Sequence, residues 1–283
     1  MFKKHDNKNH NQNSLLFGAQ AQAETKLQAL WQLGDLPTPE SVLYVADAKT
    51  PYLLVSLIDG QGDAVDGKGG IAKLTTAGAL VDKDWITGLN APKGMAVYGN
   101  RLYVADLTEV VIIDIKQQKV ISKIPVADSV FLNDVTVSDD GVVYISDTRT
   151  NKVHRLQDDK IDLYLDEVAS ANGLKALGKS LVIGANQELL LVDADKNRKV
   201  IAQGFEAAID GIEPTGDNEF IVSCWVGLVY FVDKNGQLEL LIDSREQKIN
   251  TADIGYDPHK KQLFIPNFFK NTVTAYEIKS RMK

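Results

Sequence analysis

Side chains that could bind a cation recur along this chain at a nearly constant interval. From Lys93 to Asn133, then to Asn172 and to Asp210, the intervals are 40, 39 and 38 residues, and Ala252 follows after another 42. The polar residues at or beside the repeat positions are Glu40, Lys93, Asn133, Asn172, Asp210 and Asp253. Carboxylate and amide oxygens are the ligands that hard divalent cations prefer. If the fold brings these residues together, the expected chemistry is the binding of one divalent cation, Ca²⁺ before Mg²⁺, Mn²⁺ or Zn²⁺.

Histidines do not take part in this pattern. His5, His10, His154 and His259 all fall outside the repeat positions. A zinc site built mainly from imidazoles is therefore disfavoured.

The same positions occur in six copies of one sequence repeat, in which short apolar strands alternate with turns. The copies begin at Pro39, Ala91, Phe131, Ala171, Ile209 and Asn250. In the second copy the strand Arg101–Asp106 follows the tight-turn pair Gly99-Asn100, and Val110–Ile115 supplies the next strand. A period of about forty residues with several strands per copy is typical of a β-propeller. We therefore predict an all-β, six-bladed β-propeller in which the repeated polar residues meet at one end of a central channel.

The ring of blades needs a closing strand. The sixth copy ends at Ile278 without a fourth strand. The segment Lys26–Leu33 is apolar at alternate positions, the pattern of a strand with one buried face. We predict that it forms the outer strand of the last blade. A short N-terminal helix over the same residues is the alternative.

Length and composition indicate one globular domain, which we place at residues 24–283. The chain has 283 residues, 44% hydrophobic and 24% charged, with a net charge of −7. Its basic residues form no stripe, so nucleic acid is not expected as a partner, and no apolar stretch is long enough to span a membrane. The single cysteine, Cys224, lies in the apolar run Phe220–Trp225 and is expected to be a buried hydrophobe. The oligomeric state stays open.

Residues 1–23 have the features of either a flexible tail or the remnant of an export signal. Lys3 and Lys4 would form its basic region, and Ala21 and Ala23 are small residues of the kind that signal peptidase reads. The apolar stretch around Leu15 is shorter than a working signal needs. A periplasmic or secreted location is the first expectation, and a cytoplasmic one the alternative.

The polar residues and their neighbours resemble the senescence-marker/gluconolactonase (regucalcin-like) family of calcium-dependent six-bladed propellers, to which paraoxonases are more distantly similar. The resemblance covers Pro39 to Ile278. In that family a glutamate of the first blade, the asparagine of an Asn-Gly pair and the aspartate of an Asp-Gly pair bind one divalent metal, and a further asparagine contacts the substrate. The matching residues are Glu40, Asn172 before Gly173, and Asp210 before Gly211 for the metal, and Asn133 before Asp134 for the substrate.

Two departures from the family pattern bear on the substrate. Ser41 and Val42 follow Glu40, where the family usually has Gly-Pro. Phe131 stands where regucalcin-type members carry an arginine. Without that guanidinium, the site lacks a pair of N–H donors that could bind a polyhydroxylated or anionic sugar lactone.

The resemblance implies a divalent-metal-dependent hydrolase that opens a small ester or lactone. Asp210 would hold the cation and act as general base, and Asn133 would orient the substrate carbonyl. Lys93, Phe131 and Trp225 are further candidates for contacting the substrate. The alternative is a non-enzymatic propeller that binds a ligand or a partner protein around a structural calcium.

These signals also have ordinary structural explanations. Asn-Gly and Asp-Gly are common turn pairs, and Trp225 is equally well explained as an aromatic residue packed between blades. The aspartates that follow strands in successive copies, Asp106, Asp147, Asp193 and Asp233, are assigned to turns.

Overall fold

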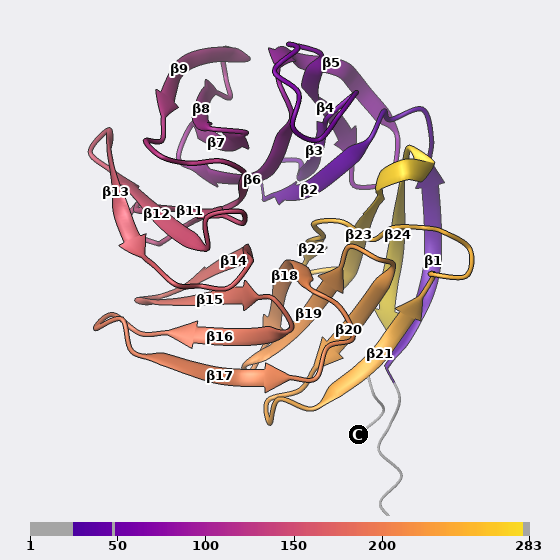
Figure 1. Ribbon diagram of the computed structural model, residues 1–283. Helices are drawn as coiled ribbons and strands as arrows, with labels where there is room; N and C mark the ends of the chain where they lie inside the picture. The colour runs from indigo at the N-terminus through magenta and orange to yellow at the C-terminus, as the bar shows by residue number, and fades with distance from the viewer. Residues whose placement is uncertain (1–24, 47–48, 280–283) are drawn as a thin grey trace, which may run out of the picture.

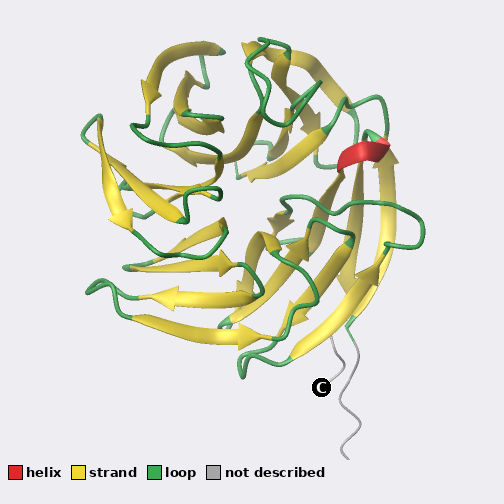
Figure 2. Cartoon of the chain, viewed as in Figure 1, coloured by secondary structure: helices red, strands yellow, loops and turns green. Residues whose placement is uncertain are grey.

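The computed structural model describes residues 25–46 and 49–279 and contains six four-stranded antiparallel sheets. The sheets stand radially around a central axis (Figure 1). Within the described ranges the only helical element is one 3₁₀ turn, η1 (Phe268–Lys270) (Figure 2). The predicted all-β, six-bladed β-propeller is confirmed. Residues 1–23, for which a tail or an export signal was predicted, lie outside the described residues.

Five blades take their strands in chain order from the channel outward. Blade 1 comprises β2 (Pro39–Val45), β3 (Tyr52–Leu57), β4 (Gly69–Thr75) and β5 (Leu80–Leu89). Blade 2 comprises β6 (Pro92–Tyr98), β7 (Arg101–Asp106), β8 (Glu109–Asp114) and β9 (Lys119–Pro125). Blade 3 comprises β10 (Leu132–Val137), β11 (Val143–Asp147), β12 (Lys152–Gln157) and β13 (Lys160–Leu165).

The other blades repeat this plan. Blade 4 comprises β14 (Ala171–Leu177), β15 (Ser180–Ala185), β16 (Glu188–Val192) and β17 (Arg198–Gln203). Blade 5 comprises β18 (Ile209–Gly216), β19 (Glu219–Cys224), β20 (Leu228–Val232) and β21 (Leu238–Asp243). Blade 6 comprises β22 (Gly255–Asp257), β23 (Gln262–Asn267), β24 (Thr272–Lys279) and, outermost, β1 (Lys26–Leu33).

The apolar pattern of each strand matches its position in the blade. The outer strand β9 alternates between exposed and partly buried side chains, as expected of a strand with one packed face. The interior strand β20 buries all five side chains of its LVYFV sequence, because neighbouring blades cover both of its faces. The hydrophobic cores accordingly lie between blades. One core joins Tyr103 and Ile112 of blade 2 with Val135 and Ile145 of blade 3. No described helix has the length and apolar character to cross a membrane.

The N-terminal segment closes the ring, as predicted. β1 pairs antiparallel with β24, so the two ends of the described chain share blade 6, and the helical alternative for Lys26–Leu33 is wrong. Trp31 of β1 lies 5.9 Å from Phe264, measured between ring centroids, and its indole N–H donates to the carbonyl oxygen of Thr76 in blade 1 at 3.1 Å. The closing strand therefore joins the last blade to the first.

The prediction that the strand-end aspartates serve turns is right for Asp193 and Asp233 and wrong for Asp106 and Asp147, which end β7 and β11 and bind the loops that lead into their own blades. The prediction that Cys224 is buried is confirmed. Asp147 accepts hydrogen bonds from the backbone N–H groups of Val130 and Phe131 at 2.9 Å each. Asp193 and Asp233 accept backbone N–H groups of the turns that follow them. Cys224 is fully buried, and burial raises the pKa of its thiol to about 12, which excludes a nucleophilic thiolate at neutral pH.

Candidate functional site

The predicted site residues lie where the inner strands of the first five blades begin. The pairing of each inner strand with its neighbour is irregular at this point, for example between Leu132 and Val135. Such a β-bulge changes the direction of the side chains around it. The residues at these irregularities are Glu40, Lys93, Asn133, Asn172 and Asp210. Neighbouring inner strands run parallel, as at the bridge between Ser41 and Asp253, so the five residues share one end of the channel, which we call the mouth.

Glycine follows the polar residue in three blades because the neighbouring inner strand passes very close. A Cβ atom on Gly173 would lie 2.1 Å from the carbonyl oxygen of Asp210, and Gly94 and Gly211 are similarly crowded. None of the three glycines has a positive φ, and Gly173 lies within β14. The interpretation of the Asn-Gly and Asp-Gly pairs as turns is therefore wrong. The pairs allow adjacent blades to approach each other at the mouth.

Buried oxygen atoms without partners mark the proposed metal ligands. The side-chain amide of Asn172 donates to Oδ1 of Asp210 at 2.9 Å, so these two ligands are in direct contact. Glu40 and Asp210 are only 5% and 3% exposed. Oδ1 of Asn172 and Oε2 of Glu40 are buried and have no hydrogen-bond partner. Since buried polar atoms are normally satisfied, these two acceptors at one end of the channel are available to a bound cation or to water.

The carboxylates of the channel raise one another's pKa values. Burial, followed by the charges of Asp210 and Asp253, holds the pKa of Glu40 well above its ordinary value. Burial, followed by Asp253, raises the pKa of Asp210 to about 8, and burial raises the pKa of Asp253 to about 7. The charged forms are therefore costly without a nearby cation, and a bound divalent ion would reverse this effect.

The side chain of Lys93 is hydrogen-bonded to backbone carbonyl groups and does not point into an open site. Its side-chain nitrogen donates to the carbonyl oxygens of Ala91 at 2.9 Å and Gly62 at 3.0 Å, and the residue is 2% exposed. Burial lowers its pKa to about 8, against the opposing effect of Glu40. Lys93 thus holds the loop between β3 and β4 against the mouth and supplies the nearest positive charge to Glu40.

Phe131 and Asn133 lie on the blade 3 side of the mouth. The ring of Phe131 contacts two cations, with the nitrogen of Lys93 at 4.4 Å and the guanidinium carbon of Arg149 at 4.3 Å from its centroid. Arg149 also pairs with Asp63 at 3.1 Å. Position 131 lacks an arginine, but Arg149 brings a guanidinium beside the same ring. Sequence reasoning missed Arg149, because it lies on a turn outside the repeat positions.

Asn133 is 8% exposed. Its amide nitrogen donates to the hydroxyl of Thr148 at 3.1 Å, and Thr148 in turn donates to the carbonyl oxygen of Ala171 at 2.8 Å. This chain of hydrogen bonds fixes the Asn133 side chain against blade 4.

Trp225 lies on the turn between β19 and β20 at the mouth end of blade 5. Its ring centroid is 5.6 Å from those of Phe268 and Phe269 in blade 6. Trp225 packs between blades 5 and 6, as one of the two interpretations predicted. It is also 38% exposed, and its contact with a substrate stays a prediction.

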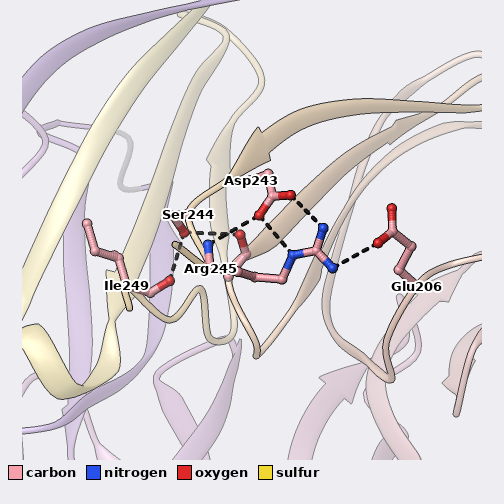
Figure 3. A network of polar contacts seen from close by, with 6 residues as sticks. Glu206, Asp243, Ser244, Arg245 and Ile249 are labelled. Atoms are coloured by element: carbon pink, nitrogen blue, oxygen red, sulfur yellow. Dashed lines mark hydrogen bonds and ion pairs between the residues drawn. The ribbon is translucent and has the colours of Figure 1, made fainter. Parts of the chain in front are cut away.

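The loop between β21 and β22 holds the Trp225 turn in place. Arg245 donates to Asp243 and Glu206, and Ser244 donates to the carbonyl oxygens of Gly227 and Ile249 (Figure 3). The same loop reaches the backbone of Trp225 through the Asn250 side-chain amide at 3.0 Å. The turn is therefore fixed by hydrogen bonds on both of its sides.

Below the mouth, the channel encloses a cavity of about 180 Å³ with further charged residues. Lys175 and Glu213 form an ion pair at 2.7 Å. Asp134 accepts the backbone N–H of Leu174, and Asp253 accepts the hydroxyl of Ser41. Sequence reasoning missed the ion pair, although a signal exists: Lys175 and Glu213 are separated by 38 residues, the same interval as Asn172 and Asp210.

The donor set fits a hard divalent cation. Nowhere in the described ranges do three or more His, Cys, Asp or Glu side chains gather as a metal site. The mouth instead combines two carboxylates, Glu40 and Asp210, with the amide oxygen of Asn172. Carboxylate and amide oxygens are ligands of Ca²⁺, which completes its shell with water. The unpartnered oxygens of Glu40 and Asn172 are the atoms that such an ion would satisfy.

No protein-family model matches the chain, and no curated protein matches its sequence. Solved structures resemble it in fold. A streptogramin B lyase has a TM-score of 0.63 at 10% identity, covering 90% of this chain and 98% of that one. A candidate gluconolactonase has a TM-score of 0.65 at 13% identity, covering 91% and 93%. Virginiamycin B lyase from Staphylococcus aureus has a TM-score of 0.60 at 14% identity, covering 90% and 100%. At these identities the likeness shows the propeller fold alone.

Proposed function

We propose that the protein is a hydrolase that opens a small ester or lactone with a divalent cation bound by Glu40, Asn172 and Asp210. The observation that carries the proposal is the pair of buried, unpartnered oxygens on Glu40 and Asn172. Asn172 contacts the carboxylate of Asp210, and the charge of Asp210 raises the pKa of Glu40. The similarity of these residues to the metal ligands of gluconolactonase-like propellers supports the same assignment. A candidate gluconolactonase among the structures of similar fold is consistent with a lactone substrate.

The bound cation, Asp210 and Asn133 would have different roles in hydrolysis. When bound, a divalent cation would polarise the substrate carbonyl and stabilise the oxyanion that develops on it. Asp210 accepts a proton from the attacking water as the water oxygen bonds to the carbonyl carbon, and returns this proton to the leaving oxygen when the acyl C–O bond breaks. The Asn172 amide binds its Oδ1 and so leaves Oδ2 for that proton. Asn133 uses one amide hydrogen on Thr148, and its second amide hydrogen orients the substrate carbonyl.

A second candidate function is a binding propeller in which the cation is structural. The observation that favours it is the depth of the site. Glu40 and Asp210 are almost fully buried, and neither they nor Asn172 lines the channel cavity of about 180 Å³. In that case the cation would join blades 1, 4 and 5 without meeting a substrate.

Hydrolysis of a panel of lactones and aryl esters, with Ca²⁺ and with a chelator, tests the proposal. We expect turnover with Ca²⁺ that the chelator abolishes and added Ca²⁺ restores. Asp210→Asn should abolish turnover even at saturating Ca²⁺, because an amide cannot accept the water proton. Asp139→Asn, an exposed carboxylate on the β10–β11 turn, is the matched control and should leave turnover unchanged. Absence of turnover on the whole panel, together with Ca²⁺ binding, would favour the structural role.

A further inference from the structure

The mouth is polar on five blades and apolar on the sixth. Blades 1 to 5 each present a charged or amide side chain at the repeat position, whereas blade 6 presents Ala252 there. In its place, blade 6 and the adjoining turn of blade 5 carry three aromatic residues in contact, Trp225, Phe268 and Phe269, which we call the aromatic wall. Their ring centroids are separated by 4.9 to 5.6 Å in edge-to-face arrangements.

The aromatic wall is exposed even though it is fixed in position. Phe269 is 67% exposed and Trp225 is 38% exposed. Phe268 forms the base, because it packs against a buried cluster of Ile58, Ala91 and Leu107 from blades 1 and 2. A contiguous exposed aromatic surface of this kind usually marks a binding site.

The turn that carries Trp225 cannot easily move. Gly227 has a φ of 113°, and a Cβ atom there would lie 2.5 Å from the carbonyl oxygen of Ile249. Ser244 donates its backbone N–H to the carbonyl oxygen of Gly227 at 2.8 Å and its hydroxyl to that of Ile249 at 2.7 Å, so the turn and the β21–β22 loop hold each other (Figure 3). A side chain held in this way binds an apolar group with little loss of conformational entropy.

The wall is continuous with the proposed site. Cys224, which precedes Trp225, pairs with Ile209, which precedes Asp210. Trp225 therefore rises from the strand next to the one that carries the proposed general base, on the same end of the propeller.

We propose that the aromatic wall binds the apolar, non-reacting part of the substrate, so that the protein acts on esters or lactones with an alkyl or aryl substituent. This inference rests on the proposed hydrolase function and names its substrate class. Two further observations support it: Phe131 brings no hydrogen-bond donor to the blade 3 side of the mouth, and the side-chain nitrogen of Lys93 already donates to two carbonyl oxygens.

Steady-state kinetics on γ-lactones with no side chain, a butyl chain and a hexyl chain test the inference. We expect kcat/KM of the wild type to rise by about tenfold or more from the unsubstituted to the hexyl lactone. Trp225→Ala and Phe269→Ala should each lower the kcat/KM of the hexyl lactone, and with it the ratio of hexyl to unsubstituted kcat/KM, by about threefold or more. Leu240→Ala, which truncates a 45% exposed side chain on the outer strand β21, is the matched control and should change neither value.

A second measurement separates this inference from the proposed function. The non-hydrolysable γ-lactam with a hexyl chain should bind the Ca²⁺-loaded protein in calorimetry, and Trp225→Ala should weaken binding by about threefold or more. Hydrolysis whose chain-length dependence is the same in Trp225→Ala as in wild type would overturn the inference and leave the hydrolase intact. Binding of the lactam without turnover of any lactone would overturn the hydrolase function and leave the assignment of the wall as an apolar binding surface intact. A change of oligomeric mass in Trp225→Ala would assign the wall to a second copy of the chain and also overturn the inference.

Discussion

Replacing Gly173 with alanine tests whether close approach of the blades shapes the mouth. The new Cβ atom would lie 2.1 Å from the carbonyl oxygen of Asp210, whereas such contacts are essentially never under 3.0 Å. The oxygen must therefore move by about 0.9 Å, and it is a main-chain atom of the proposed general base. Overpacking usually costs about 1–3 kcal/mol, and more where backbone must shift. We expect the free energy of unfolding to fall by about 3 kcal/mol or more.

Urea denaturation followed by circular dichroism measures this loss, and calorimetry measures the accompanying loss of Ca²⁺ affinity. Gly34→Ala is the control, because no atom lies within 4 Å of its added Cβ and its φ is not positive. It should change stability by about 1 kcal/mol or less. Equal stability of the two variants, with unchanged Ca²⁺ affinity in Gly173→Ala, would refute the close-approach explanation.

Two other predictions concern the charges inside the channel. Lys175→Met or Glu213→Gln should each lower stability by about 1–3 kcal/mol, because either removes one partner of the partly buried 2.7 Å ion pair. The double variant should lose less than the sum in urea denaturation. The metal-free protein should lose stability as pH rises from about 4 to 8, because folding raises the pKa of Asp210 from 3.8 to about 8 and so disfavours its charged form. Asp210→Asn should weaken that dependence, whereas an identical pH profile in the variant would contradict the assignment.

The fold was predictable because its signals are local and repeated. Alternating apolar residues in Lys26–Leu33 identified the closing strand, and the interval from Asn133 to Asn172 to Asp210 identified residues that share one end of the channel. In a propeller, equivalent positions must meet around the axis, so the interval alone places them.

Contacts made by loops were not predictable in the same way. The direction of the Lys93 side chain depends on Gly62 in the β3–β4 loop, whose path no periodicity encodes. The same holds for Arg149, which reaches Phe131 from a turn. The Asn-Gly and Asp-Gly pairs were ambiguous, because glycine serves both turns and close packing, and only the position of Gly173 against Asp210 decides between them.

The central claim is that Glu40, Asn172 and Asp210 bind one divalent cation. Calorimetric titration of the metal-free protein with CaCl₂ tests it most directly. The account predicts one site per chain, with affinity reduced by about tenfold or more in Glu40→Gln and in Asp210→Asn and unchanged in Asp139→Asn. No binding heat with Ca²⁺, Mg²⁺, Mn²⁺ or Zn²⁺, or a site that both variants leave intact, would contradict it.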